Sequence, residues 1–153
     1  MKGIVIKSPS EIGVMRQAGR IVALTLGILA REVRSGMRTA ELDDIAQREI
    51  ERQGAKASFK GYRGFPASVC VSVNEEIVHG IPGERVFEEG DIVSLDLGVL
   101  HCRIHGDSTV TVGVGRISPE ATRLIETTRG ALDAGIDAAR DGAYLGDKPV
   151  GCH

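Results

Sequence analysis

The sequence predicts an α+β domain, and three observations lead to this prediction. Two segments with helical spacing of apolar residues come first, three strand-like segments then follow one another, and a further helical segment comes last. Consecutive strands without intervening helices favour an antiparallel sheet over the strict alternation of doubly wound folds. The chain has 153 residues, 42% of them apolar, which suffices for one core. We therefore expect residues 1–153 to form a single domain.

The first helix is expected over about Pro9 to Val33. The sequence Ser8-Pro9-Ser10-Glu11 has the form of a capping box with proline at the first helical position, which satisfies free backbone N–H groups. The pair Ser35-Gly36 is expected to end the helix. Apolar residues recur at helical spacing and form its inner face: Ile12, Met15, Ile21, Val22, Leu26 and Leu29.

A second helix is expected over about Ala40 to Gln53. Thr39 has the side chain of an N-cap residue, and Gly54 suits the position that closes a helix. The inner face of this helix consists of Leu42, Ile45 and Ile50. The two helices together make residues 1–54 a predicted helical hairpin.

Residues 55–115 are expected to form a β-meander. The segment 67–73 alternates small or polar residues with valine, which is the period of a half-buried strand. The segments 91–97 and 107–113 are the next two strands and are close enough in sequence to form a hairpin.

A third helix is expected within residues 116–145. Ser118-Pro119-Glu120 has the residues of a helix start, and the helical pattern runs to about Arg140. Residues 148–153 continue none of these patterns, and we describe them as an aberrant tail.

Charge and composition exclude several classes of function. Lysine plus arginine (19) nearly balances aspartate plus glutamate (21), so we expect no nucleic-acid partner. We also expect no membrane span, because no apolar run is expected to approach the roughly 20 residues that a span needs, and we expect no signal peptide. Three widely spaced cysteines suggest reduced thiols rather than a disulfide framework or zinc site. The expected location is the cytoplasm.

Two aspartates on the predicted hairpin indicate a metal site. A two-residue turn at His101-Cys102 would place Asp96 directly opposite Asp107, with Cβ atoms about 4.5–5.5 Å apart. Like charges at that separation are destabilising unless a cation lies between them, and carboxylates suit divalent Co, Mn, Fe, Zn or Mg. The alternative is that both are solvated turn residues. Neither His101 nor His105 is predicted to be a ligand.

The alternation of the hairpin supports a polar cleft on one side of the sheet. A single register should separate an apolar face from a polar one, since successive side chains point to opposite sides. The apolar face would carry Val93, Leu95 and Leu97 with Ser108, Val110 and Val112, and the polar face Ser94 and Asp96 with Asp107, Thr109 and Thr111.

Three stretches of the sequence resemble the type I methionine aminopeptidases. The longest is 61–82, which reads GYRGFPASVCVSVNEEIVHGIP. DIVSLD at 91–96, followed by IHGDST at 104–109, is similar to the metal-ligand hairpin of that family, and EIGVMRQAG at 11–19 is similar to its first helix. The resemblance implies a pita-bread fold, of which this chain holds half to two-thirds as an antiparallel curved sheet with covering helices.

The resemblance also implies roles for individual residues. Asp96 would chelate one of two divalent ions and Asp107 would bridge both, while His79 would act in catalysis by hydrogen-bonding the substrate near its scissile amide. The methionine side chain would lie in a pocket lined by Tyr62, Phe65 and Cys70, and a thiol and aromatic rings suit a thioether. Each residue has a plainer alternative: Cys70 as a core residue, Tyr62 and Phe65 as loop packing, and His79 as a cap of its loop.

The implied activity is the removal of N-terminal methionine from nascent polypeptides, with the ribosome as a further expected partner. Beyond Leu145-Gly146-Asp147 the family continues into a second half that supplies a His and two Glu ligands, and residues 148–153 do not resemble it. We therefore expect impaired catalysis and self-association through an exposed sheet edge. The alternatives are a non-catalytic pita-bread module that binds peptides or the ribosome, and an inactive truncated product.

Overall fold

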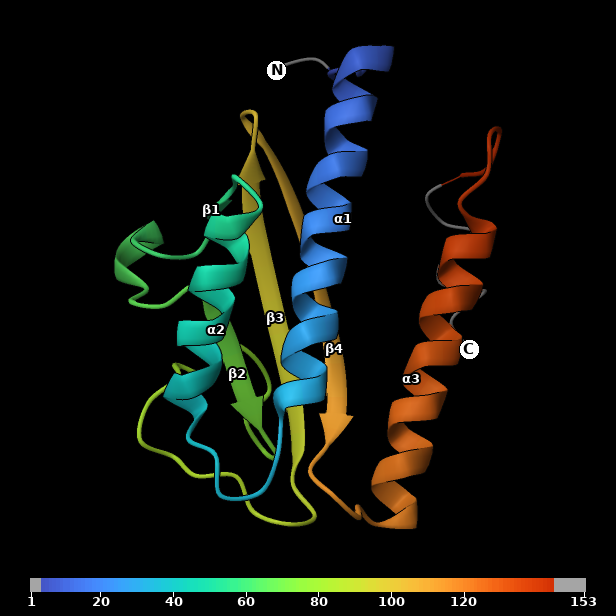
Figure 1. Cartoon of the computed structure of the whole chain (residues 1–153). Coiled ribbons are helices and arrows are strands. Elements are labelled where there is room, and N and C mark those ends of the chain that lie inside the picture. Colours follow the sequence, from blue (N-terminus) through green and yellow to red (C-terminus); the bar gives the residue numbers. More distant parts are fainter. Residues whose placement is uncertain (1–3, 145–153) are drawn as a thin grey trace. The chain divides into compact units, whose positions relative to one another are not determined.

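The computed structural model describes residues 4–144. The chain divides into two compact units, residues 1–116 and 117–153, which are described separately. The elements in chain order are α1 (Pro9–Glu32), α2 (Thr39–Arg52), β1 (Lys56–Ala57), the 3₁₀ turn η1 (Tyr62–Gly64), β2 (Val69–Val73), β3 (Ile92–His101), β4 (Ile104–Gly113) and α3 (Pro119–Ala138) (Figure 1). The predicted α+β class and the order of helices and strands are confirmed.

The sheet of the first unit is antiparallel and is built around β3. One edge of β3 pairs with β4 along its whole length, and the other edge pairs with β2 and, at one end, with β1. The predicted meander β2–β3–β4 is therefore present, and the two-residue strand β1 is an addition that the sequence pattern did not predict. β1 is too short for any alternation to be visible.

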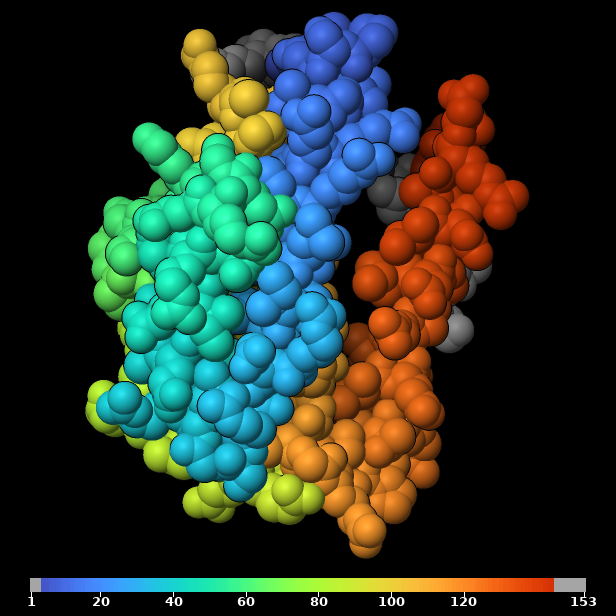
Figure 2. Space-filling view, viewed as in Figure 1, coloured from blue at the N-terminus to red at the C-terminus, as the bar shows by residue number. Residues whose placement is uncertain are grey.

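Helices α1 and α2 cover one face of this sheet, and Figure 2 shows their side chains spread over it. The strands contribute alternate buried residues to the core between the two layers, and Gly106 of β4 lets α1 approach closely, because a Cβ atom there would press against Ala18. The alternation leaves the polar residues of β3 and β4 on the opposite face. The fully buried members of the core include Ala18, Leu29, Leu42, Ile50, Leu95 and Leu97.

The start of α1 follows the predicted capping box. The Ser8 hydroxyl accepts from the Glu11 N–H at 3.3 Å, and the Glu11 carboxylate accepts from the Ser8 N–H at 2.7 Å. In α2 the N-cap is Arg38, so the prediction of Thr39 is wrong by one residue. The Thr39 hydroxyl instead exchanges hydrogen bonds with the backbone of Gly83, which attaches α2 to the loop after β2.

The expectation that the chain holds no long apolar segment is wrong for α1. This helix has 24 residues and a mean hydropathy of 1.4 in its most apolar window, so its length and composition alone would suffice to cross a membrane. Its inner face, however, is occupied by the sheet: Ala18, Val22 and Leu29 are buried in the core. Helices of this length and apolarity also occur in the cores of proteins without membrane spans.

The two outer edges of the sheet differ. Along β2, the N–H groups of Val69, Val71 and Val73 donate to the Asp43 carboxylate, the Gly80 carbonyl and the Glu76 carboxylate. Within residues 4–144, β4 pairs with β3 alone, so its outer edge has no strand partner. An unpaired edge of this kind was predicted from the resemblance.

The second unit contributes α3 to the described structure. Ser118 caps the helix by accepting from the Ala121 N–H at 3.0 Å, as predicted, and the helix ends at Ala138 rather than near Arg140. The expected tail, residues 148–153, lies outside the described residues. The assignment of residues 1–153 to one domain stays a prediction.

Candidate active site

Asp96 and Asp107 lie on the same face of the hairpin, but they are not directly opposite each other. Asp96 pairs with Thr109, and Asp107 pairs with Gly98. The predicted register is therefore wrong by two positions, because the turn consists of Cys102 and Arg103, with φ of 46° and 69°. A shift of two positions keeps every side chain on its predicted face, so the apolar pattern cannot distinguish the two registers.

The two carboxylates influence each other electrostatically. Diagonal neighbours on an antiparallel pair have Cα atoms about 7–8 Å apart, which is within reach of two side chains that converge on one ion. Partial burial raises the pKa of Asp107, the negative charge of Asp96 raises it further, and His105 acts in the opposite direction. Neither carboxylate forms a salt bridge to a Lys, Arg or His side chain in the described part of the chain.

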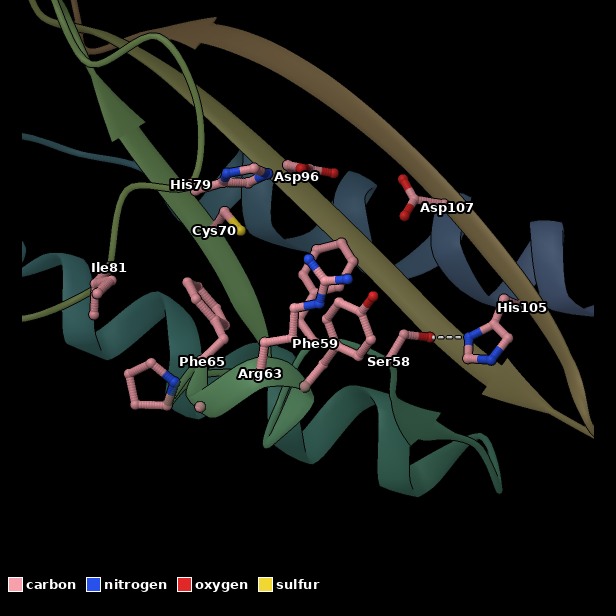
Figure 3. A pocket seen from close by; sticks show the side chains of 13 residues that line it. Ser58, Phe59, Arg63, Phe65, Cys70, His79, Ile81, Asp96, His105 and Asp107 are labelled. Carbon is pink, nitrogen blue, oxygen red and sulfur yellow. Dashed lines mark hydrogen bonds between the residues drawn. The ribbon is translucent and has the colours of Figure 1, made fainter.

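The site shown in Figure 3 is a cavity of about 760 Å³ in the first unit. It collects residues from β2, β3, β4 and the loops around η1 and after β2, which are far apart in the sequence. All six residues predicted for the site line it: Tyr62, Phe65, Cys70, His79, Asp96 and Asp107.

His79 is held over β2 by the glycine that follows it. The Val71 N–H donates to the Gly80 carbonyl at 2.9 Å, and the Gly80 N–H donates to the Ser72 hydroxyl at 3.1 Å. A Cβ atom at Gly80 would clash with the Val71 carbonyl oxygen, so only glycine allows this close approach. His79 itself has φ of 59°, a left-handed conformation that is uncommon outside glycine and that often occurs at functional sites. The loop turns its imidazole toward Cys70 and Asp96 (Figure 3).

The apolar wall of the cavity consists of aromatic rings and a thiol. The rings of Phe59 and Phe65 pack edge to face, with centroids 6.4 Å apart. The Phe59 ring occupies space that a side chain at position 98 would fill, since a Cβ atom at Gly98 would lie 2.7 Å from this ring. Cys70 is buried and pairs with Asp96 across β2 and β3. Burial, followed by the charges of Asp96 and Asp107, raises its pKa to about 11, so its thiol stays neutral.

Several lining residues were missed by sequence reasoning. The chain has only five Phe and Tyr residues, and three of them line this cavity. Phe59 could therefore have been noticed as one of the few aromatic residues close in sequence to Tyr62 and Phe65. His105 hydrogen-bonds the Ser58 hydroxyl at 2.9 Å and lies on the cavity side of β4, two residues from Asp107. His105 and Asp107 are two positions apart on the same strand, so the alternation alone places both side chains on one face, and this signal was available for His105. The missed residues are Ser58, Phe59, Arg63, Gly64, Pro66, Ile81 and His105.

The residues of the cavity supply some, but not all, of the ligands that a divalent cation needs. Two carboxylates on one face offer the hard oxygen donors that such ions accept, and their charges lack a basic partner among the described residues. Within residues 4–144, however, no group of three or more His, Cys, Asp and Glu side chains converges closely enough to hold an ion. Asp96 and Asp107 thus form an incomplete set of ligands.

Comparison with known proteins gives the class of the fold and site. Residues 13–148 match the model of metallopeptidase family M24, and the chain belongs to this family. It is 52% identical to methionine aminopeptidase 1 of Bacillus subtilis over 142 residues, which are 93% of this chain and 57% of that protein. The chain therefore spans little more than half the length of this relative.

Solved structures agree with the sequence comparison. The crystal structure of methionine aminopeptidase from Rickettsia prowazekii matches with a TM-score of 0.95 and 33% identity, over 98% of this chain and 60% of that one. The structure of the Thermotoga maritima methionine aminopeptidase matches with a TM-score of 0.94 and 37% identity, over 97% and 60%. The predicted resemblance to methionine aminopeptidases, and a fold that corresponds to about 60% of the pita-bread architecture, are confirmed.

Proposed function

We propose that this chain carries part of a metal-dependent methionine aminopeptidase site, which acts on the N-terminal methionine of nascent polypeptides. The observation that supports it most is the convergence of two carboxylates, an imidazole and an apolar wall on one cavity. Its relatives over nearly the whole chain are named methionine aminopeptidases. The cavity volume is within the range of about 300–1,000 Å³ that is usual for small-ligand sites.

The apolar wall would bind the first side chain of the substrate. Phe65, Tyr62 and the neutral Cys70 thiol offer polarizable, apolar surface, which suits the sulfur and methylene groups of methionine. A neutral thiol is required here, because a thiolate would add a third negative charge beside Asp96 and Asp107. The raised pKa of Cys70 keeps that thiol protonated at physiological pH.

His79 would orient the scissile amide at the polar end of the cavity. Its backbone is held by the contact between Gly80 and β2, so the imidazole is positioned before substrate binds. Asp96 and Asp107 would hold two divalent ions, and the candidates are Co, Mn, Fe, Zn and Mg. Such ions, when bound, polarise a carbonyl and lower the pKa of water.

We expect turnover by the chain alone to be slow, because two carboxylates leave an ion short of ligands. The unpaired edge of β4 supports self-association of the chain, since exposed strand edges pair readily with other strands. The ribosome would be a partner of this aminopeptidase and the cytoplasm would be its location, because the proposed substrate is the nascent chain.

A second candidate is a module that binds N-terminal peptides without cleaving them. The observation that favours it is the absence of a third close ligand among residues 4–144.

The test is release of methionine from Met-Ala-Ser with Mn²⁺ or Co²⁺ added, compared between the wild type and Asp107→Asn. Release that depends on metal and on Asp107 supports the aminopeptidase. Saturable peptide binding with no release at high protein concentration would support the binding module instead, and neither binding nor release would leave only an inactive product.

A further inference from the structure

Arg63 occupies a rigid turn at the exposed side of the cavity. It lies between Gly61 and Gly64, both with φ of 84°, and itself has φ of 49°. The turn is closed by hydrogen bonds from the Gly61 N–H to the Phe65 carbonyl at 2.8 Å and from the Phe65 N–H to the Tyr62 carbonyl at 3.0 Å. A left-handed conformation at a residue other than glycine is strained, and the surrounding bonds keep it in place.

The guanidinium group of Arg63 stacks on an aromatic ring and has no acidic partner in the described part of the chain. Its central carbon lies 5.4 Å from the centroid of the Tyr62 ring, in the range of a cation–π contact. Arg38, Arg52 and Arg85 each form a salt bridge with glutamate, whereas Arg63 forms none within residues 4–144. Stacking on an aromatic ring limits the motion of the side chain and leaves its N–H groups available to an anion.

The cavity has a negative charge in its interior and a positive charge at its exposed side. Asp96 is half-buried and lies beside the buried Cys70, while Arg63 is exposed and lines the same cavity (Figure 3). A peptide whose first residue lies against Cys70 and Phe65, with its first amide near His79, would leave the cavity on the exposed side. Its second to fourth residues would then lie close enough for the Arg63 side chain to contact them.

We infer that Arg63 is a specificity residue that favours peptides with a carboxylate side chain in the first few positions after the N-terminal residue. This inference rests on the proposed function, because it takes the N-terminus of a peptide to lie in the cavity. A guanidinium group binds carboxylate through paired N–H donors, so both charge and shape contribute to the preference. An exposed ion pair of this kind should change affinity by about two- to fivefold.

The test compares isosteric peptides that cannot be hydrolysed. The series is Met-Ala-Ala-Ala-amide with the first amide reduced to CH₂–NH, and with Asp or Asn placed in turn at position two, three or four. Dissociation constants are measured by calorimetry on the full chain with Mn²⁺ present, for the wild type, Arg63→Gln and Arg63→Lys. Arg48→Gln is the matched control, because it removes the same charge from an exposed position on α2 outside the cavity.

The expected result is that the wild type binds the Asp peptide about two- to fivefold more tightly than the Asn peptide at one position at least. The preference should disappear in Arg63→Gln, be partly kept in Arg63→Lys, be unchanged in Arg48→Gln, and weaken as salt is raised. Equal binding of Asp and Asn peptides by the wild type at every position overturns the inference and leaves the proposed function intact. An unchanged preference in Arg63→Gln also overturns it. If no methionine peptide binds, the proposed function fails, and the inference fails with it.

Discussion

Asp107 pairs with Gly98 rather than with Asp96, so the two aspartates of the hairpin are diagonal neighbours on the same face of the sheet. This arrangement lessens the repulsion that directly opposed carboxylates would have, and both side chains still line the same cavity (Figure 3). The raised pKa of Asp107 shows that some repulsion and desolvation persist. A cation between the two carboxylates would remove both effects.

Asp107 should reduce the stability of the metal-free protein as the pH rises. Its pKa is raised above the ordinary value of 3.8, so the native state binds this proton more tightly than the unfolded state. The stability from this proton is fully present below pH 3.8 and is lost as the pH rises through the native value. In EDTA, we expect Asp107→Asn to become more stable relative to the wild type between pH 4 and pH 7.

The gain should stay below about 1 kcal/mol, because the Asp107 side chain is largely exposed and its charge is screened. Thermal unfolding midpoints across this pH range measure it, with Asp44→Asn on the exposed face of α2 as the matched control. A wild type that gains stability relative to Asp107→Asn as the pH rises would contradict this prediction.

Gly80→Ala should destabilise the fold and displace His79. The added Cβ atom would meet the Val71 carbonyl oxygen, so the loop must move away from β2. We expect a loss of roughly 2 kcal/mol in the free energy of unfolding, measured by urea denaturation. Gly83→Ala is the control, since its Cβ atom would meet nothing within 4 Å, and it should change stability by less than about 0.5 kcal/mol. Equal effects of the two substitutions would show that the contact with β2 does not hold the loop.

Cys70 should react with iodoacetamide far more slowly than Cys102. Cys102 is exposed, whereas Cys70 is buried with a pKa of about 11, so only about one in a hundred Cys70 thiols is ionised at pH 9. Peptide mass spectrometry after timed labelling measures both rates. In urea the two cysteines should react alike, which serves as the control. Rapid labelling of Cys70 in the native protein would mean that the cavity wall is open or that the thiol is ionised.

Phe65→Ala should weaken the binding of peptides that begin with methionine. The lost aromatic contact with the methionine side chain should cost about five- to tenfold in affinity, since Phe65 is only half-buried. A peptide that begins with alanine does not reach this wall and should lose less than twofold, and calorimetry on the two peptides measures the difference. A similar loss for both peptides would place the first side chain elsewhere.

The helices and the faces of the strands could be predicted because local chemistry specifies them. The capping box at Ser8 and Glu11 and the Ser118-Pro119 start gave helix ends within one or two residues. The alternation in 91–97 and 107–113 placed Asp96 and Asp107 on one face, as observed. The roles of the site residues came from the resemblance to methionine aminopeptidases and stay predictions, although all six residues line one cavity.

The features that were missed depend on contacts between distant segments. The register was wrong by two positions because a strand has a period of two, and because Cys102-Arg103 has none of the glycine or asparagine that marks a left-handed turn. The place of Phe59 depends on the absence of a side chain at Gly98. His105 is different, because the strand alternation puts it on the same face as Asp107 in either register. β1 has two residues, too few to show a period.

The most direct test is a titration with Mn²⁺, in which electron paramagnetic resonance counts the free ion. If Asp96 and Asp107 share a divalent cation, the wild type binds Mn²⁺ saturably, and Asp96→Asn and Asp107→Asn each bind it at least about tenfold more weakly. Asp44→Asn, which lies on α2 outside the cavity, should bind as the wild type does. Saturable binding that survives both cavity substitutions, or no binding by the wild type, would contradict a shared cation at these two carboxylates.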